Sequence, residues 1–166
     1  MSLPTTPQTW TRGPFLISTD SQLLSLASIN DAFDQDFMYW TKPYPEEILQ
    51  TIINNSFCFG LYEVNESKPR QQIGFARLIT DRTTFAYLSD LYVLPKYWGL
   101  GLGGWVIDCV DEVLVDLPHL RWTMLRTGTE RSKQAYEKRM GMTVLGMKDI
   151  SEGPIMMGRR GKGVGA

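Results

Sequence analysis

The chain has 166 residues, of which 43% are hydrophobic and 21% are charged, a size and composition typical of one folded domain. Lysine plus arginine (17) nearly balance aspartate plus glutamate (18), so no overall charge favours a nucleic acid or an anionic membrane as partner. No apolar run approaches the roughly 18 residues that span a bilayer, and the N-terminus lacks the regions of a secretion signal. We therefore expect a cytoplasmic, single-domain protein over residues 1–166, with its core from about residue 15 to residue 158.

The remaining compositional features concern metals, disulfides and the C-terminus. Cys58 and Cys109 are far apart and lack Cys-x-x-Cys spacing, so we interpret both as core thiols. His119 is the sole histidine, which excludes metal sites that need two imidazoles, and we expect no metal. Residues 159–166 are rich in glycine and cations; we expect a disordered tail, with a phosphate-contacting arm as the alternative.

Two helices are predicted in the first third of the chain, after a short strand. Asp20 or Ser21 is the expected N-cap of the first helix, whose apolar side chains continue to Phe33. Pro45 suits the first position of the second helix, because the two glutamates that follow complement the helix dipole. Between the helices, residues 37–44 are rich in aromatic side chains, which fit either satellite core packing or the wall of an acceptor site.

The pattern then changes to the two-residue period of β-strands. We expect strands over residues 57–64, 72–80 and 84–94, the last two joined by the turn Asp81-Arg82. Connections this short join antiparallel neighbours, because a parallel crossover needs about a dozen residues or more. An antiparallel meander is therefore predicted.

A helix with a strong apolar stripe follows at residues 102–114. The later expected elements are a strand over 121–126, a helix capped by Thr129 and reaching Met140, and strands over 142–147 and 155–157. The strand after the long helix should run parallel to the one that ends at Leu94, through a right-handed crossover. The predicted fold class is a mixed α/β domain in which an antiparallel meander precedes a β-α-β crossover.

A turn with four glycines, Trp98-Gly-Leu-Gly-Leu-Gly-Gly104, lies between the meander and the long helix. Gly99, Gly101 and Gly104 have the spacing G-x-G-x-x-G. Glycines there allow positive φ angles and a close approach of the backbone to a ligand, while the free N–H groups at the helix N-terminus attract an anion such as a pyrophosphate. The turn therefore predicts an anion site.

A dinucleotide-binding fold uses the same spacing but a different context. It places the turn after the first strand of a parallel unit, whereas here the meander comes first. It also needs an acid about 20 residues past the turn, at the end of the next strand, where this chain has Leu125-Arg126-Thr127. A dinucleotide-binding oxidoreductase is the remote alternative.

The segment from Tyr87 to Gly104 resembles the acetyl-CoA-binding motif of GNAT N-acetyltransferases, written R/Q-x-x-G-x-G/A. Residues 55–62, 72–77 and 80–88 are also similar to a widespread subgroup of small GNAT proteins. The resemblance implies the GNAT acyl-CoA N-acyltransferase fold, acetyl-CoA as cosubstrate and an amine as acceptor, and it is nearly silent on which amine.

The resemblance also implies which residues bind the cofactor. The backbones of Leu91, Val93 and Leu94 would bind the pantetheine arm, and the turn would form the pyrophosphate cradle, made of Trp98, Gly99, Leu100, Gly101, Leu102, Gly103 and Gly104. Trp98 stands where the family has Arg or Gln, which removes a cation or amide donor but no backbone N–H. Since the cradle works mainly through main-chain amides, we expect cofactor binding to survive.

A tyrosine on the helix after the fifth strand serves as general acid in the family, and Tyr136 is the matching residue. A phenol of pKa about 10 can protonate a departing thiolate whose thiol has a pKa near 8.5. Family members commonly place this tyrosine four residues before a glycine, whereas Gly141 is five residues away, and one residue turns a helix by about 100°.

Asp90 is the candidate general base for the amine. Strand alternation puts it with apolar residues, where burial would favour proton uptake. The alternative is a carboxylate paired with a buried cation such as Arg77. If Asp81-Arg82 is a two-residue turn, Arg77 lies opposite Ala86, about 13 Å along the strand from Asp90 and too far for a direct pair. A longer turn would remove that argument.

The acceptor is expected to be the primary amine of a small molecule, with neither nucleic acid nor membrane as partner. Its candidate walls are Tyr39, Trp40, Tyr44, Phe75 and Arg77. The aromatic side chains favour an arylalkylamine or an amino-acid-like acceptor. A non-catalytic acyl-CoA-binding or regulatory protein and a protein or histone N-acetyltransferase are the alternatives, and the sequence leaves a homodimer open.

Overall fold

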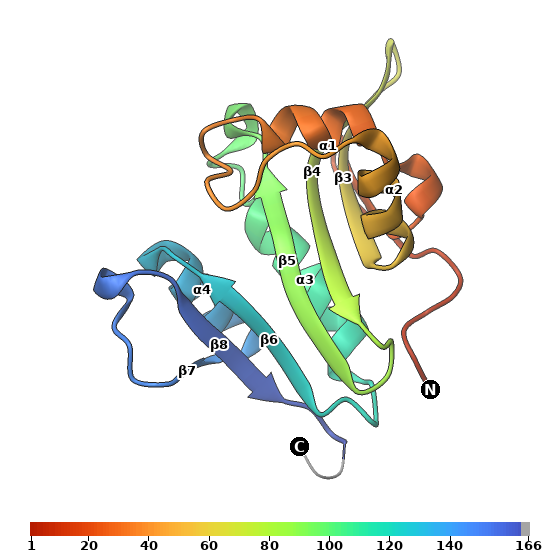
Figure 1. Ribbon diagram of the computed structural model, residues 1–166. Coiled ribbons are helices and arrows are strands. Elements are labelled where there is room, and N and C mark those ends of the chain that lie inside the picture. Colours follow the sequence, from red (N-terminus) through yellow and green to blue (C-terminus); the bar gives the residue numbers. More distant parts are fainter. Residues whose placement is uncertain (164–166) are drawn as a thin grey trace. The chain divides into compact units, whose positions relative to one another are not determined.

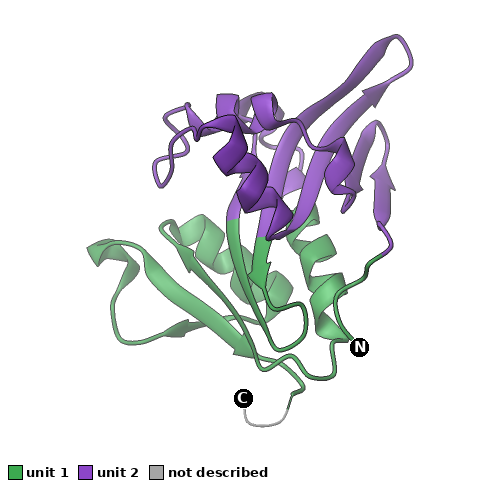
Figure 2. Ribbon diagram, turned by 45° about the vertical axis from the view of Figure 1, so that its right-hand side comes forward, with its two compact units in different colours: residues 1–5, 78–89, 104–166 green, residues 6–77, 90–103 purple. Residues whose placement is uncertain are grey.

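The computed structural model describes residues 1–163 and divides the chain into two compact units (Figure 2). Unit 1 comprises residues 1–5, 78–89 and the described residues from 104 onward, and unit 2 comprises residues 6–77 and 90–103. Strands β4 (Lys68–Thr80) and β5 (Phe85–Val93) contribute residues to both units. The strands form one mixed sheet in the order β1-β2-β3-β4-β5-β6-β8-β7, which confirms the predicted mixed α/β class.

Unit 2 holds the N-terminal elements, the first part of β4 and the end of β5 (Figure 1). Its complete elements are β1 (Thr9–Arg12), β2 (Phe15–Ser18), the 3-10 helix η1 (Ser21–Leu23), α1 (Leu26–Phe33), α2 (Glu46–Asn54), β3 (Phe57–Asn65) and the 3-10 helix η2 (Pro95–Tyr97). Strands β1, β2 and β3 pair antiparallel in sequence. Strand β1 lies outside the core predicted to start at residue 15, so the fold begins earlier than expected.

Helices α1 and α2 share one hydrophobic core with strands β3, β4 and β5. The core is made of Ile29, Ala32, Phe33, Met38, Leu49, Ile53, Cys58, Phe75 and Tyr92, all at most 4% exposed. These side chains come from both helices, from one residue of each of the three strands and from Met38 in the segment between the helices. The helices therefore cover the face of these strands that carries Phe75 and Tyr92.

The first helix begins later than the sequence suggested. Asp20 caps only the short helix η1, and Leu24 is then extended, with φ −68° and ψ 138°. Ser25 caps α1 by accepting a hydrogen bond from the amide of Ser28 at 3.1 Å, and its own amide donates to Gln72 Oε1 at 2.8 Å. The prediction of one helix from residue 20 or 21 was wrong because this long-range bond to β4 fixes the start at Ser25.

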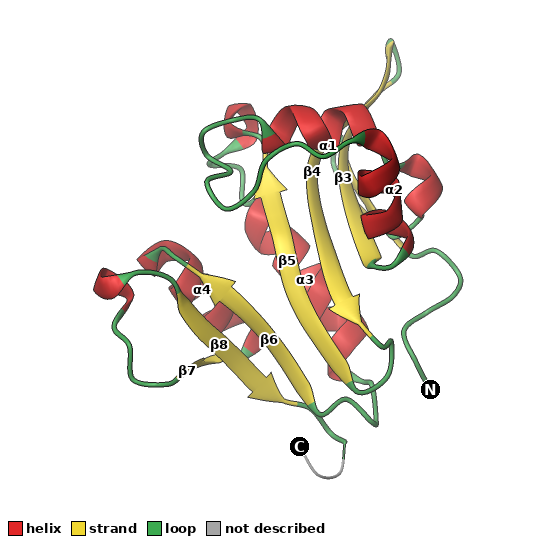
Figure 3. Cartoon of the chain, viewed as in Figure 1, coloured by secondary structure: helices red, strands yellow, loops and turns green. Residues whose placement is uncertain are grey.

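Unit 1 contains the β-α-β crossover and the C-terminal strands (Figure 3). Its elements after β5 are α3 (Leu102–Val115, from Gly104 onward in this unit), β6 (Trp122–Thr127), α4 (Glu130–Met140), β7 (Thr143–Leu145), the 3-10 helix η3 (Ile150–Glu152) and β8 (Ile155–Arg160). Residues 85–88 of β5 pair parallel with residues 122–125 of β6, as predicted for a crossover. Strand β8 pairs antiparallel with both β6 and β7.

The connection between β4 and β5 has four residues rather than two. The carboxylate of Asp81 accepts hydrogen bonds from the amides of Thr83, Thr84 and Phe85, at 3.0, 2.8 and 3.1 Å. Arg82 adopts a positive φ of 72°. These bonds to Asp81 hold residues 81–84 as one compact turn, so the predicted two-residue turn was wrong.

The segment predicted as a disordered tail belongs to the fold as far as residue 163. Arg159 lies in β8 and forms an ion pair with Asp111 of α3 at 2.5 Å, and it also donates to the carbonyl of Met140 in α4 at 2.7 Å. Residues 164–166 lie outside the described residues. The expectation was wrong for residues 159–163 because Arg159 has partners on both helices.

Candidate active site

The glycine turn leads from η2 into α3. Gly99 and Gly101 adopt positive φ angles of 84° and 75°, as predicted, and a Cβ at either position would meet nothing within 4 Å. Backbone conformation rather than crowding therefore requires glycine at these two positions. The turn leaves open space beside the main chain, as a site for an anion needs.

The other two glycines have different roles. A Cβ on Gly103 would make ordinary contact with Val93 at 3.9 Å. In unit 1, a Cβ on Gly104 would lie 2.5 Å from the guanidinium of Arg139, which also pairs with Asp108 of α3 at 2.6 Å. Gly104 thus makes room for a cation over the first turn of α3. Arg139 was not predicted as part of the site, because its contacts with Gly104 and Asp108 join residues more than 30 positions apart.

Strand β5 turns its backbone at Asp90, whose φ is 55°. Beyond that residue, the carbonyl of Tyr92 lies towards β4, since a Cβ on Gly74 would approach it to 2.7 Å, and the amide of Leu94 donates to the carbonyl of Ile73 at 2.8 Å. Backbone groups of successive strand residues point to opposite edges. The backbone of Val93 therefore points away from β4.

This alternation separates the three predicted pantetheine partners. Leu91 and Val93 are two residues apart and share an edge, whereas Leu94 faces β4. The amide of Leu94 is engaged with Ile73, and its carbonyl accepts from the amide of Tyr97 at 2.9 Å. The expectation for Leu94 is corrected accordingly, because its backbone groups already have partners within the protein.

Asp90 lies at the centre of a hydrogen-bonded network in unit 2. Arg77 Nε donates to Asp90 Oδ2 at 2.7 Å, Trp40 Nε1 donates to Asp90 Oδ1 at 3.0 Å, and Arg77 Nη1 donates to Ser56 Oγ at 3.1 Å. The side chains of Arg77 and Asp90 are only 17% and 10% exposed. The expectation that Arg77 is too far from Asp90 was wrong, because the turn between β4 and β5 is longer than two residues and the backbone of β5 departs from regular strand geometry at Asp90.

The acceptor segment, residues 37–44, is anchored to α1. The side chain of Asn30 donates to the carbonyl of Tyr44 at 2.8 Å and accepts from the amide of Tyr44 at 3.0 Å. The rings of Tyr39 and Trp40 pack edge to face with centroids 5.1 Å apart, and Tyr39, Trp40 and Tyr44 are 65%, 45% and 38% exposed. Three of the predicted acceptor residues therefore lie on the surface, and Asn30, which the sequence did not single out, fixes Tyr44 at the end of their segment.

One of the predicted acceptor residues, Phe75, lies on the side of β4 that faces the hydrophobic core. Phe75 is 1% exposed and packs against Tyr92, with ring centroids 6.3 Å apart. It belongs to the core under α1 and α2. The expectation that Phe75 forms a wall of the acceptor site is corrected, since its ring is enclosed by other apolar side chains.

Tyr136 lies in α4 of unit 1. The helix runs regularly to its end, where Gly141 is left-handed with φ 63° and the amide of Met142 donates to the carbonyl of Tyr136 at 3.3 Å. No irregularity absorbs the extra residue between the tyrosine and the glycine. Tyr136 is 8% exposed, and burial raises the pKa of its phenol above the ordinary value.

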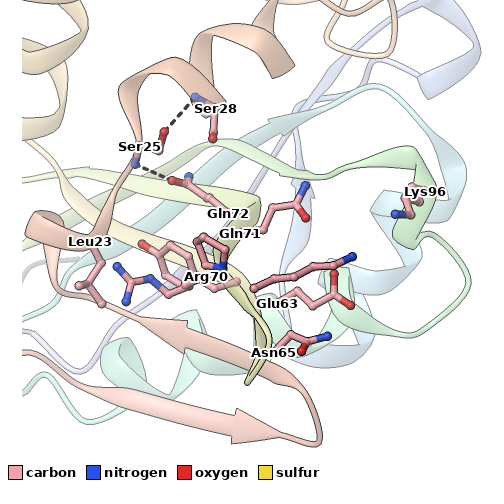
Figure 4. Close-up of a pocket in the computed structure, with 12 residues that line it drawn as sticks. Leu23, Ser25, Ser28, Glu63, Asn65, Arg70, Gln71, Gln72 and Lys96 are labelled. Atoms are coloured by element: carbon pink, nitrogen blue, oxygen red, sulfur yellow. Dashed lines mark hydrogen bonds between the residues drawn. The ribbon is translucent and has the colours of Figure 1, made fainter.

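The described residues of unit 2 also enclose a cavity of about 680 Å³ between α1, the β3–β4 hairpin and η2 (Figure 4). Its lining is mostly polar and includes Glu63, Lys68, Arg70 and Lys96. None of the predicted cofactor or acceptor residues lines it. The candidate active site therefore does not coincide with this cavity.

Comparison with known proteins decides the family. The sequence profile described as Acetyltransferase (GNAT) family matches residues 26–142. A protein of Gibberella zeae named "Putative acetyltransferase FG08082" is 39% identical over 171 residues, covering 90% of this chain and 96% of the relative. This chain belongs to the GNAT acetyltransferase family. The resemblance seen in the glycine turn and meander is confirmed.

Solved structures agree with this assignment. A GNAT-family protein from Xanthomonas campestris pv. campestris has a TM-score of 0.62 and 31% identity, over 83% of this chain and 88% of that chain. A protein from Acinetobacter baylyi ADP1 described as "Putative Acetyltransferase (ACIAD1637)" has a TM-score of 0.63 over 94% of both chains, and its 22% identity shows the fold alone. The chain is an N-acetyltransferase with the GNAT fold, as predicted.

The described residues of the GNAT protein also bear on membrane spans, metal sites and the two cysteines. Among residues 1–163, no helix is both long and apolar enough to cross a membrane. The same residues contain no group of three or more histidine, cysteine, aspartate or glutamate side chains placed to hold a metal ion. Cys58 and Cys109 are buried at 4% and 2% exposure, which confirms them as core thiols.

Proposed function

We propose that this GNAT enzyme transfers an acetyl group from acetyl-CoA directly to the primary amine of a small molecule. The observation that carries the proposal is the glycine turn, where Gly99 and Gly101 hold positive φ angles beside open space at the start of α3. Main-chain amides in such a turn, together with the helix dipole, suit a pyrophosphate. Bound acetyl-CoA supplies the thioester that a neutral amine attacks.

The edge of β5 supports binding of the pantetheine arm. The backbone of Val93 points away from β4, and Leu91 shares that edge by alternation. An extended ligand with amide groups can pair with this edge as an additional strand would. We therefore assign the pantetheine arm to Leu91 and Val93 and the pyrophosphate to residues 98–104.

The exposed aromatic side chains favour a small acceptor with an apolar or aromatic part. Tyr39, Trp40 and Tyr44 lie in one anchored segment, and the indole of Trp40 is tied to Asp90. Arg77 is oriented by Asp90 and Ser56 in the same network. Aromatic faces attract ammonium groups, and an oriented guanidinium suits a carboxylate. An arylalkylamine or an amino-acid-like amine is the acceptor class we propose.

Tyr136 is the proposed general acid. Its phenol stays protonated across the physiological range, as an acid requires, and burial raises its pKa still further above that of a thiol. Proton transfer to the departing thiolate is then uphill and must be coupled to breakdown of the tetrahedral intermediate. Mutation of Tyr136 tests this role directly.

The role of Asp90 as general base stays a prediction, and the hydrogen bonds of Asp90 argue for a different role. Both carboxylate oxygens already accept hydrogen bonds from Arg77 and Trp40. Protonation of Asp90 would weaken at least one of these bonds. A positioning role, in which Asp90 fixes Arg77 and Trp40 for the acceptor, fits this geometry better than proton uptake.

The decisive experiment measures CoA release from acetyl-CoA with a panel of arylalkylamines, amino acids, polyamines and peptides, alongside thermal shifts with acetyl-CoA and with NADH. We expect a thermal shift with acetyl-CoA and turnover with a small amine. Binding without turnover on any amine would support a non-catalytic acyl-CoA-binding protein, and turnover on peptides alone would support protein N-acetylation. A shift with NADH but none with acetyl-CoA would overturn the proposed cosubstrate.

A single catalytic domain made from both units is part of this proposal, because the family profile spans residues of both. A cytoplasmic location and a homodimer remain predictions from the sequence. Size-exclusion chromatography with light scattering tests the oligomeric state.

A further inference from the structure

Trp98 is the residue at which the glycine turn departs from the family pattern, and its side chain has a specific partner. The indole Nε1 donates a hydrogen bond to the carbonyl of Val93 at 2.7 Å. Val93 is 7% exposed, whereas Trp98 is 58% exposed. The bond therefore joins an exposed indole ring to the backbone carbonyl of a buried strand residue.

This carbonyl belongs to the edge of β5 that is proposed to pair with the pantetheine arm. Tyr92 and Leu94 direct their backbone groups to β4, so the backbone of Val93 points to the opposite edge. A pantetheine amide that pairs with this edge needs Val93 O as its acceptor. The Trp98 indole N–H donates to this same carbonyl.

We propose that Trp98 gates the pantetheine arm: its indole N–H caps Val93 O in the free enzyme and leaves when a cofactor amide takes the same carbonyl. The inference rests on the proposed use of acetyl-CoA. It assigns to the Trp98 side chain a role in cofactor entry that differs from that of the arginine or glutamine at this position in the family pattern.

The same ring also reaches the acceptor segment. Trp98 packs edge to face on Phe37, with ring centroids 5.9 Å apart, and Phe37 in turn lies 6.2 Å from the ring of Tyr92. Phe37 is the first residue of the acceptor segment, residues 37–44. Departure of Trp98 removes one partner of Phe37, so cofactor binding changes the surroundings of the acceptor segment.

The size of the effect follows from an exchange of hydrogen bonds. Val93 O has a donor in both states, and the exposed indole can donate to water once displaced. Displacement of Trp98 breaks one intramolecular hydrogen bond and one edge-to-face ring contact, and each contributes a modest net free energy. The gate should therefore weaken acetyl-CoA binding by about threefold to tenfold.

Trp98→Phe isolates the donor, because it keeps an aromatic ring beside Phe37 and removes the N–H. Calorimetric titration with acetyl-CoA should give a Kd about threefold to tenfold lower than in the wild type. Titration with adenosine 3′,5′-bisphosphate, which lacks the pantetheine arm, should give the same Kd for both proteins. Trp122→Phe is the matched control; Trp122 lies in β6 beside Arg160, with 5.5 Å from its ring centroid to the guanidinium carbon, and this change should leave both Kd values unchanged.

Stopped-flow tryptophan fluorescence provides a second readout. Acetyl-CoA should change the emission of the wild type and of Trp122→Phe, and Trp98→Phe should lose this change. Equal or weaker acetyl-CoA binding by a folded Trp98→Phe protein overturns the gate while leaving the cosubstrate intact. If neither protein binds acetyl-CoA, both the gate and the proposed function fail.

Discussion

Gly99 and Gly101 of the glycine turn lie in the same unit as the Asp90 network, but the two sites are built in opposite ways. At Gly99 and Gly101 the backbone conformation is what matters, and the space around it is open. At Asp90 the side chains matter, because Arg77 and Trp40 hold both carboxylate oxygens. A site built from main chain tolerates exchange of its side chains but not of its φ angles, whereas a site built from paired side chains depends on each partner.

The largest expected effect comes from breaking the ion pair. Arg77→Met leaves Asp90 charged, 10% exposed and without its cation, so the free energy of unfolding should fall by about 3–4 kcal/mol, measured by urea denaturation. Lys162→Met is the control, because the pair of Lys162 with Asp116 is exposed and should contribute less than about 1 kcal/mol.

The double variant Arg77→Met/Asp90→Asn sharpens this test. Asparagine tolerates the positive φ of residue 90 and carries no charge, so most of the stability should return. If the double variant is as unstable as Arg77→Met alone, the loss arises from packing of the arginine rather than from an unpaired carboxylate.

Tyr136→Phe tests whether the proposed general acid is as hard to replace as the members of the Asp90 network. Loss of the proton donor should lower kcat by about 100-fold and leave the Kd for acetyl-CoA within about twofold. Tyr97→Phe is the matched control, since that hydroxyl donates to Glu63 in unit 2. An unchanged kcat in Tyr136→Phe would retire the residue as general acid.

Gly101→Ala tests the main-chain character of the turn. An L-residue at φ 75° is strained by about 1–2 kcal/mol, so acetyl-CoA should bind about tenfold more weakly in calorimetric titration. Gly13→Ala is a matched control, because Gly13 also has a positive φ (55°) and open space for a Cβ. It should cost stability to a similar extent without changing cofactor affinity, and equal effects on binding would show that the turn acts only through global stability.

The smallest expected effect concerns the turn that sets the register between Arg77 and Asp90. Asp81 accepts hydrogen bonds from the hydroxyl of Thr84 and from the backbone amides of Thr83, Thr84 and Phe85. These bonds hold the pKa of the Asp81 carboxyl well below its usual range. A carboxyl whose pKa is lower in the folded state stabilises the fold above its unfolded pKa of about 3.9 and loses that contribution as pH falls below it. Asp81→Asn should lower Tm by about 2–4 °C at pH 7, and the difference should shrink below about pH 4. A gap that is constant from pH 7 to pH 3 contradicts this account.

The features that the sequence predicted depend on local pattern. The apolar stripe of α3, the meander and the spacing of Gly99 and Gly101 each follow from residues close together in the chain. For this reason the fold and the glycine turn could be predicted. The family resemblance came from the same local segments.

The features that could not be predicted depend on contacts between distant residues. Gln72 fixes the start of α1 at Ser25, 47 positions away in the chain, and this bond leaves no periodic signal. The four-residue turn at Asp81 and the positive φ of Asp90 together bring Arg77 to Asp90. Strand alternation predicts that the backbones of Val93 and Leu94 face opposite edges. Which of them faces β4 became clear only from the hydrogen bond between Leu94 and Ile73.

The two glycines near the C-terminus have a practical consequence for shortened versions of the chain. The amides of Gly161 and Gly163 donate to the carbonyls of Arg121 and Leu120 at 2.8 Å, and a Cβ on Gly163 would lie 2.3 Å from the carbonyl oxygen of His119. These residues form a seam with no room for a side chain. A protein that ends at residue 158 would leave the carbonyls of Leu120 and Arg121 without these donors. The exposed backbone could then pair with other chains. For expression work, residues 159–163 should be kept and any affinity tag placed after a spacer.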